Sequence, residues 1–216
     1  VVCGGSSLLE AFQRMETLEF CARMLIHAHQ IGKFRTLSGQ QLDKFKNIPE
    51  SLDEIEVKTH GVFERELRKL MVDVVHRSYE RKLMCSTEGV VSARVDNRSF
   101  LITPTDVDRY QFTVEDIVLI NDGTREKGKQ PSRATHLHQS IYQENPEIKS
   151  IITSQSPYAM AFAITSKRFD SHTIPESYIM LRDVPNIDHD ILYDHPEKVA
   201  RAVSPSSPVL LIENDC

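Results

Sequence analysis

The sequence predicts an α/β fold in which helices cover a largely antiparallel sheet. Three observations predict it. Two long segments in the first third of the chain place apolar residues three and four positions apart, which is typical of helices. After residue 90 the apolar residues alternate with polar ones, as they do in strands. Tight turns close successive strands, and such hairpin connections make neighbouring strands antiparallel.

The first predicted helix begins after Ser7. Ser7 and Glu10 have the spacing of a capping box, in which each side chain accepts a hydrogen bond from a free backbone N–H of the first turn. Gly32 is expected to end this helix. Before it, Val1-Val2 is expected to be the end of a strand that turns at Gly4-Gly5. The apolar stripe of the helix comprises Leu8, Phe12, Met15, Leu18, Ala22, Leu25 and Ile26.

A polar segment without apolar periodicity follows, from residue 36 to residue 58, with Pro49 in its middle. We expect it to be a linker that contains one short helix, Gln40–Lys46. A second long helix is predicted over residues 61–84. Its apolar stripe comprises Phe63, Leu67, Leu70, Met71, Val74, Val75 and Ser78.

The remaining predicted elements are shorter. Asp96-Asn97 is expected to join the first two strands, and Asp122-Gly123 to close the third. A helix is predicted from Pro131-Ser132 to Pro146, with Ser132 as its N-cap, and another at Pro157–Thr165. The predicted strands are Val91–Val95, Ser99–Thr105, Asp116–Asn121, Ile148–Thr153, Ser177–Leu181 and Val209–Glu213.

Composition narrows the function classes. The chain has 216 residues, 40% of them apolar, and a net charge of −5. Nucleic-acid binders usually carry a basic surplus, and no Lys/Arg-rich run occurs, so no nucleic-acid partner is expected. No stretch reaches the about 18 consecutive apolar residues of a membrane helix, and no signal peptide is visible, so no membrane association is expected. The four cysteines form no C-x-x-C pair, which indicates reduced thiols and a cytoplasmic location.

Three segments of the sequence resemble the class II aldolase/adducin family. They read VVSARVDNRSFLITPTDVDRYQFTVEDIVLIN, GKQPSRATHLHQSIYQENPEIKSIITSQSPYAMAFA and LLIENDC. The family includes L-fuculose-phosphate aldolase and ribulose-phosphate epimerases. The resemblance implies a three-layer α/β/α sandwich around a mainly antiparallel sheet. It also implies tetramers with sites at subunit junctions.

The order of the segments is unusual for this family. Residues 1–35 resemble the C-terminal strand end and helix of such a domain, and residues 36–60 are expected to be a linker. Residues 61–216 resemble an aldolase-like domain without its last helix. A piece of a tandem protein explains this order, and so does a circular permutant; the linker favours the tandem arrangement. The expected partner is therefore a tandem domain, or further copies of this chain in a tetramer-like homo-oligomeric ring.

The resemblance implies a zinc site whose ligands are absent from this sequence. Family aldolases hold zinc with an H-x-H before the SPYA helix and a third histidine in an Asn-His-Gly turn. Here those positions are Thr153, Gln155 and Asp215. Because neutral oxygens are poor zinc ligands, no zinc cofactor is expected. The family's catalytic glutamate corresponds to Ala134, which cannot carry a proton.

The resemblance also implies an anion pocket, and this pocket is partly retained. Val90 stands where the family has an asparagine, and Asp106 stands where it has a glycine and would repel phosphate. The guanidinium of Arg133 can donate two parallel hydrogen bonds to an anion. We therefore predict a small phosphorylated ligand. The predicted ligand-binding residues are Ser92, Thr103, Thr105, Ser132 and Arg133.

Other polar residues have simpler explanations. His136 and His138 are two positions apart on a predicted helix, so their rings point about 200° apart and a shared metal is not expected. His189 lies between two aspartates and is expected in a solvated loop. Tyr178 lies near the position of a family interface tyrosine, and a packing role is expected.

Three functions are compatible with these residues. The main hypothesis is a non-catalytic aldolase-like domain, structural or ligand-binding, that accompanies an aldolase of carbohydrate metabolism. One alternative is an active aldehyde-lyase or epimerase for small sugar phosphates such as L-fuculose 1-phosphate. Its candidate metal ligands would be Asp106, Asp215 or Glu213, together with His136. The other alternative is an adducin-like protein-binding module, although the chain shows no basic tail.

Overall fold

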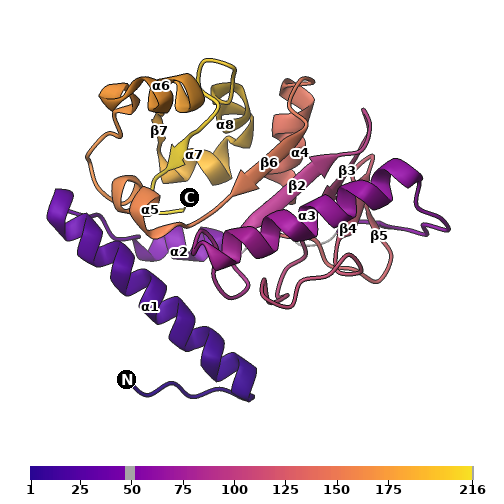
Figure 1. The fold of residues 1–216 in the computed structure, drawn as a ribbon, viewed down its shortest axis with the longest axis horizontal. Coiled ribbons are helices and arrows are strands. Elements are labelled where there is room, and N and C mark those ends of the chain that lie inside the picture. Colours follow the sequence, from indigo (N-terminus) through magenta and orange to yellow (C-terminus); the bar gives the residue numbers. More distant parts are fainter. Residues whose placement is uncertain (47–51, 216) are drawn as a thin grey trace. The chain divides into compact units, whose positions relative to one another are not determined.

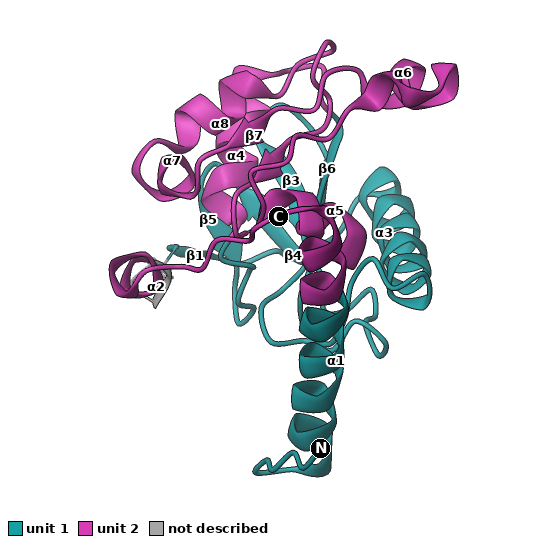
Figure 2. Cartoon of the chain, turned by 90° about the vertical axis from the view of Figure 1, so that its left-hand side faces the viewer, with its two compact units in different colours: residues 1–23, 50–133, 149–156 teal, residues 24–49, 134–148, 157–216 magenta. Residues whose placement is uncertain are grey.

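The computed structural model describes residues 1–46 and 52–215. They form two compact units, which Figure 2 shows in different colours. Unit 1 comprises Val1–Arg23, Glu50–Arg133 and Lys149–Ser156, and unit 2 comprises Met24–Pro49, Ala134–Ile148 and Pro157–Cys216. Pro49 of the predicted linker and the terminal Cys216 lie outside the described residues.

Unit 1 is built on a six-stranded sheet with the strand order β1-β5-β4-β3-β2-β6 (Figure 1). Strands β1 and β5 pair in parallel, and the other neighbours pair antiparallel. The predicted α/β fold with a mainly antiparallel sheet is therefore confirmed. The strands are β1 (Glu54–Ile55), β2 (Val90–Arg94), β3 (Ser99–Ile102), β4 (Val118–Asn121), β5 (Thr124–Glu126) and β6 (Ser150–Thr153).

Tight turns set the register of this sheet. The Asp96 carboxylate accepts hydrogen bonds from the backbone N–H groups of Arg98 (2.8 Å) and Ser99 (2.9 Å), which closes the β2–β3 hairpin. Asp122 and Gly123 both have positive φ, as a type I′ turn between β4 and β5 requires. Both predicted turns are confirmed. Strand β5 is three residues long and lacks apolar alternation, so its sequence does not predict it.

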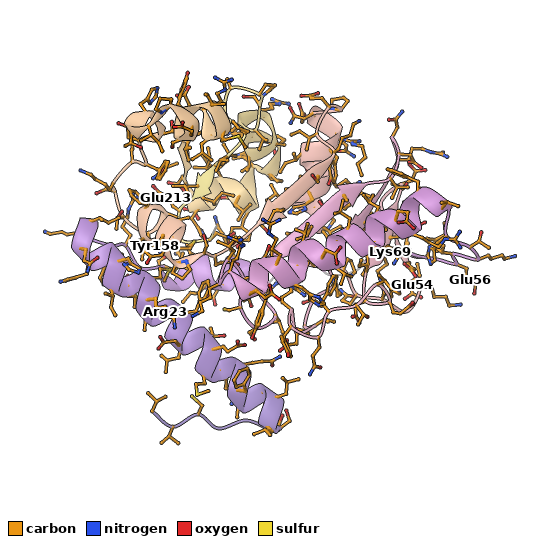
Figure 3. The ribbon with its side chains drawn as sticks, viewed as in Figure 1. Arg23, Glu54, Glu56, Lys69, Tyr158 and Glu213 are labelled. Atoms are coloured by element: carbon orange, nitrogen blue, oxygen red, sulfur yellow. The ribbon has the colours of Figure 1, made fainter. Side chains whose placement is uncertain are left out.

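The outer strand β1 is held by charged side chains as well as by its backbone. Glu54 and Glu56, both labelled in Figure 3, pair with basic residues of the β5 segment. The distances are 2.9 Å from Glu54 Oε1 to Arg125 Nη2 and 2.7 Å from Glu56 Oε1 to Lys127 Nζ. A short edge strand lined with charges resists pairing with another chain.

Helix α3 (Val62–Glu80) packs against β2 and covers the core of unit 1 (Figure 1). Met71 and Val75 are buried in one cluster with Leu101 of β3. Each such side chain stabilises the fold by about 2 kcal/mol on removal from water. Phe63 and Leu70 of the predicted stripe are 61% and 58% exposed, so the buried face of α3 is narrower than predicted.

Helix α1 (Leu8–Ile31) begins and ends where the sequence predicts. The Ser7 hydroxyl accepts a hydrogen bond from Glu10 N (3.1 Å), and the Glu10 carboxylate accepts one from Ser6 N (2.5 Å). This is a capping box in which the second bond goes to the preceding residue. Across residues 1–46 and 52–215, no helix is long and apolar enough to cross a membrane.

The apolar stripe predicted on α1 is largely exposed; Leu8, for example, is 89% exposed. The first half of the helix instead contacts unit 1 through polar groups. Gln13 Nε2 donates to Asp108 Oδ2 (3.2 Å), and the Tyr79 hydroxyl donates to the Glu16 carboxylate. Val1-Val2 belongs to no strand in the described part of the chain, so the predicted strand end is wrong.

Besides the end of α1, the described residues of unit 2 form short helices and one pair of two-residue strands. Its strands β7 (Asn186–Ile187) and β8 (Leu211–Ile212) pair in parallel. Helix α2 confirms the short helix predicted in the linker. The helices are α2 (Gly39–Lys46), α4 (Thr135–Glu144), α5 (Pro157–Ala163), α6 (Pro175–Leu181), α7 (His189–Asp194) and α8 (Pro196–Ala202), with a 3₁₀ helix at Ser171–Thr173.

The core of unit 2 joins the end of α1 to α5 and β8. Ala28 packs with Met160 and Leu211 in one buried cluster. Downstream of α1, Phe34 forms a β-bridge with Thr165, which follows α5. The end of α1 is therefore fixed to α5 both by apolar contact and by backbone pairing.

Further contacts hold the other helices of unit 2. Helix α4 packs against α8, where Asn145 Nδ2 donates to Ala200 O (2.9 Å). Tyr158, labelled in Figure 3, is 71% exposed and stacks on His27 with 4.3 Å between ring centroids.

One predicted strand of unit 2 is wrong. Residues Ser177–Leu181 lie in helix α6. Pro175 occupies the first helical position, where its fixed φ suits a helix and its missing N–H is not needed. The helix buries none of its residues, so an apolar pattern alone could not distinguish it from a strand.

Candidate functional site

Three segments of unit 1 meet beyond the ends of β2 and β3. Thr103, directly after β3, donates from its N–H to Val91 O (3.0 Å), and its hydroxyl accepts from Val91 N (3.2 Å). Thr103 O accepts from Ser132 N (3.1 Å), and Thr105 N donates to Gln130 O (3.2 Å). Residues 103–105 therefore lie between the start of β2 and residues 130–132.

The five predicted ligand-binding residues differ in exposure. Ser92 and Thr103 are fully buried, and Ser132 is 9% exposed. Thr105 is half-buried, and Arg133 is exposed. Ser92 pairs with the residue before Thr103, so the two side chains lie on opposite faces of the sheet. Thr105 and Arg133 are thus the members of the set that reach solvent, while Ser92 and Thr103 are buried. Ligand contact by the five residues stays a prediction.

Two of these turns contain a residue with a positive φ. Gly89, just before β2, has φ +92°, and a Cβ added there would lie 2.5 Å from Cγ of the buried Met84. Glycine is therefore required at this position on two grounds. Asp106, which the resemblance places at a glycine position of the family, has a positive φ of 57°. Its carboxylate is exposed beside the half-buried Thr105.

The start of the following helix differs from the prediction. Ser132 is not an N-cap, because α4 begins at Thr135 with Ala134 in the capping position and no side-chain cap bond. Pro131 instead forms a β-bridge with Pro104. The backbone of residues 131–132 is therefore paired with the turn after β3, and the helix starts three residues later.

The residues at the family's zinc positions do not fit zinc. Thr153 ends β6, and the Oε1 atom of Gln155 is buried without a hydrogen-bond partner among the described residues. Asp215 belongs to unit 2 and accepts a hydrogen bond from the Tyr193 hydroxyl (3.1 Å). Neutral oxygens are poor zinc ligands. Within the described ranges, no group of three or more His, Cys, Asp or Glu residues could hold a metal ion.

The histidines singled out by the sequence lie in unit 2. Helix α4 exposes His136 and buries His138, as their spacing predicts. Burial lowers the pKa of His138 to about 3, so its ring is neutral. The predicted solvated loop at His189 is wrong, because His189 is 3% exposed in the first turn of α7. The Asp188 carboxylate caps that helix by accepting a hydrogen bond from Asp190 N (2.8 Å), which fixes the backbone at the N-terminus of α7.

The residues that would serve an active aldehyde-lyase or epimerase belong to different units. Asp106 lies in unit 1, and His136, Glu213 and Asp215 lie in unit 2.

Tyr178, in helix α6, stacks on His172 with 4.5 Å between ring centroids. This contact accords with the packing role expected for Tyr178.

Residues 69–214 match the Class II Aldolase and Adducin N-terminal domain family. The match covers more than half of the chain, and the chain belongs to this family. The resemblance drawn from the sequence motifs is therefore confirmed.

Individual relatives give a more detailed comparison. The chain is 30% identical over 122 residues to L-fuculose phosphate aldolase of Methanococcus vannielii, a match covering 56% of this chain and 66% of that protein. It is 31% identical over 104 residues to methylthioribulose-1-phosphate dehydratase of Methylococcus capsulatus, covering 48% of this chain and 50% of that protein. The chain thus spans less than two thirds of the length of these relatives.

The fold is similar to a solved structure of the same family. L-fuculose-1-phosphate aldolase from Thermus thermophilus superposes with a TM-score of 0.60 at 19% identity. The superposition covers 70% of this chain and 78% of that one. At this identity the likeness concerns the fold.

Proposed function

We propose that this chain binds a small sugar phosphate at the three turns of unit 1 described above, residues 89–92, 103–106 and 130–133. The observation that carries the proposal is the pairing of Thr103 with both Val91 and Ser132, which brings the three turns together. The backbone N–H groups of Thr103, Thr105 and Ser132 already donate to oxygens of the chain, so side chains are the donors that we propose for the phosphate. The exposed Arg133 guanidinium can add two parallel bonds to a phosphate. The names of the relatives support a sugar phosphate as the ligand class.

Calorimetric titration tests this proposal with three probes: L-fuculose 1-phosphate, inorganic phosphate and unphosphorylated L-fucose. We expect the two phosphates to bind and L-fucose not to bind. Arg133→Ala should weaken phosphate binding about tenfold, because a charge-assisted bidentate contact is lost. Arg98→Ala is the control, since the Arg98 side chain is 76% exposed in the β2–β3 turn. Binding of L-fucose as tight as that of its phosphate would contradict the proposal.

The role of the bound sugar phosphate has two candidates. The substitutions at Ala134, Thr153 and Gln155 favour a non-catalytic role, in which this chain binds the ligand beside an intact aldolase domain. The relatives' names, an aldolase and a dehydratase, favour an active aldehyde-lyase or epimerase. In that second case another group, such as Asp106 or His136, would have to move the proton.

Elemental analysis of protein purified without chelators separates the two roles, combined with a turnover assay on L-fuculose 1-phosphate. About one zinc per chain and cleavage that a chelator abolishes would establish the enzyme. A folded protein that binds the sugar phosphate without metal and without turnover would establish the non-catalytic role. Size-exclusion chromatography of the same sample tests the proposed homo-oligomeric ring.

A further inference from the structure

Arg109 lies in the loop after β3 and is one of the most deeply buried charged residues of unit 1, at 2% exposure. Among the described residues, its guanidinium donates to backbone carbonyls alone. Nε and Nη2 both donate to Gly89 O (3.1 and 2.9 Å), Nη1 donates to Val107 O (2.8 Å), and Nη2 also reaches Pro104 O (3.3 Å). One planar side chain therefore connects the turn before β2 to the turn after β3.

The same two turns form the proposed phosphate site. Gly89 opens the first of them with φ +92°, and residues 104–107 form the second, with Asp106 at φ +57°. The backbone of Arg109 makes a third connection, because its N–H donates to Ser86 O (2.8 Å). Together with the Thr103–Val91 pairing, a single buried side chain therefore connects the two turns.

The charge of Arg109 is not neutralised by contact. No carboxylate in the described ranges lies within ion-pair distance of its guanidinium. Arg68, the other buried arginine of unit 1, differs: it pairs with Glu64 (2.8 Å) and Glu126 (3.1 Å). Burial lowers the pKa of Arg109 to about 10, so the side chain still carries its charge at neutral pH. Glu88, Asp108, Asp106 and Asp116 lie near enough to act on this charge electrostatically and offset part of it, so its hydrogen bonds, rather than its charge, distinguish Arg109.

We propose that Arg109 is a positioning residue for the phosphate group of the ligand. Its guanidinium holds the Gly89 turn and the Pro104–Val107 turn at the separation that the phosphate requires. The inference rests on the proposed function. Lysine cannot replace it, because an ammonium group is a point charge that cannot bond three carbonyls in one plane.

Titration of Arg109→Lys and Arg109→Met with inorganic phosphate tests this role, well below the unfolding temperature of each variant. The matched control is Arg68→Lys, which also replaces a buried arginine of unit 1 that donates to backbone carbonyls. We expect Arg109→Lys to weaken phosphate binding about tenfold and Arg109→Met to weaken it further. We expect Arg68→Lys to lower the unfolding temperature and to leave the phosphate affinity unchanged.

The phosphate affinity of the Arg109 variants decides whether Arg109 has the positioning role. Should Arg109→Met fail to fold, Arg109→Lys decides alone, since it keeps the charge and most of the volume. Phosphate binding by Arg109→Lys as tight as that of Arg68→Lys would overturn the positioning role and leave the proposed function standing. Wild-type protein that binds neither phosphate nor L-fuculose 1-phosphate would overturn both.

Discussion

Arg35 and Glu213, 178 residues apart in the chain, form an ion pair with two parallel hydrogen bonds of 2.8 Å each. Both residues belong to unit 2, and Figure 3 labels Glu213. Next to the pair, Asn214 Nδ2 donates to Arg35 O (2.9 Å), so the segment after α1 is tied to the segment after β8. Both oxygens of the Glu213 carboxylate accept from a guanidinium, which favours a structural role for Glu213 over that of a metal ligand.

Replacing Arg35 by lysine should lower the free energy of unfolding by about 1 kcal/mol. The reason is that an ammonium group cannot make both bonds at once, and that the Arg35 side chain is 51% exposed, which limits the value of the pair. Urea unfolding measures the loss, and it should shrink at high salt. Arg23→Lys is the control, because Arg23 pairs with Glu19 on the exposed face of α1. Equal effects of the two substitutions would contradict the prediction.

Gly89→Ala should destabilise the protein by about 2–3 kcal/mol, since it adds a steric clash with Met84 to the strain of a positive φ. Gly128→Ala separates the two contributions. Gly128 also has a positive φ, 78°, but an added Cβ would meet no atom within 4 Å. We expect this control to cost about 1 kcal/mol, from backbone strain alone. Thermal unfolding of both variants measures the difference, and equal losses would show that Met84 yields without cost.

Glu126 should make the stability of unit 1 sensitive to acid. Burial alone would raise the pKa of its carboxyl, but hydrogen bonds from Lys129, the Leu119 N–H and Arg68 outweigh this and hold the pKa below its ordinary 4.5. A carboxyl with a lowered pKa in the folded state contributes stability above pH 4.5, and this contribution is lost as the pH falls through the lowered value. Glu126→Gln should therefore be less stable at neutral pH and lose less stability in acid.

Urea unfolding from neutral pH down to about pH 3 measures this effect. Glu66→Gln is the control, because Glu66 is 65% exposed and pairs with the equally exposed Lys69. That variant should follow the wild-type pH profile. An acid loss as steep in Glu126→Gln as in the wild type would assign the acid sensitivity to other carboxyls.

Asp106→Asn should tighten the binding of inorganic phosphate, by roughly threefold to tenfold, because it removes a negative charge from the second turn of the proposed site. Asparagine also tolerates the positive φ of 57°, so the backbone should not change. Asp122→Asn is the matched control: Asp122 is another aspartate of unit 1 with positive φ, 46°, but it lies in the β4–β5 turn. Calorimetry compares the three proteins, and equal affinities would place Asp106 away from the phosphate.

The sequence was sufficient to predict those features that depend on contacts between residues close together in the chain. The Asp96 turn, the Asp122-Gly123 turn and the Ser7 cap each depend on residues within a few positions of one another, and all three form as predicted. The identity of Ala134 likewise does not depend on the fold, but its place at the position of a catalytic glutamate stays a prediction.

The predictions that failed concern residues whose state depends on distant parts of the chain. Ser132 has the composition of an N-cap, but its N–H is taken by Thr103 O, and α4 starts later. His189 sits among aspartates in the sequence, yet it is buried once Asp188 has started α7. The apolar stripe of α1 is regular, but neighbours in unit 1 contact its polar residues instead.

By itself the sequence determined the family and the mainly antiparallel sheet, because these follow from residue identity and local spacing. The tertiary structure alone decided that Ser92 and Thr103 are buried while Thr105 and Arg133 are not. It also decided that Arg109 joins two turns that flank separate strands. Burial and long-range hydrogen bonding arise only when segments far apart in the chain pack together, and no local pattern encodes them.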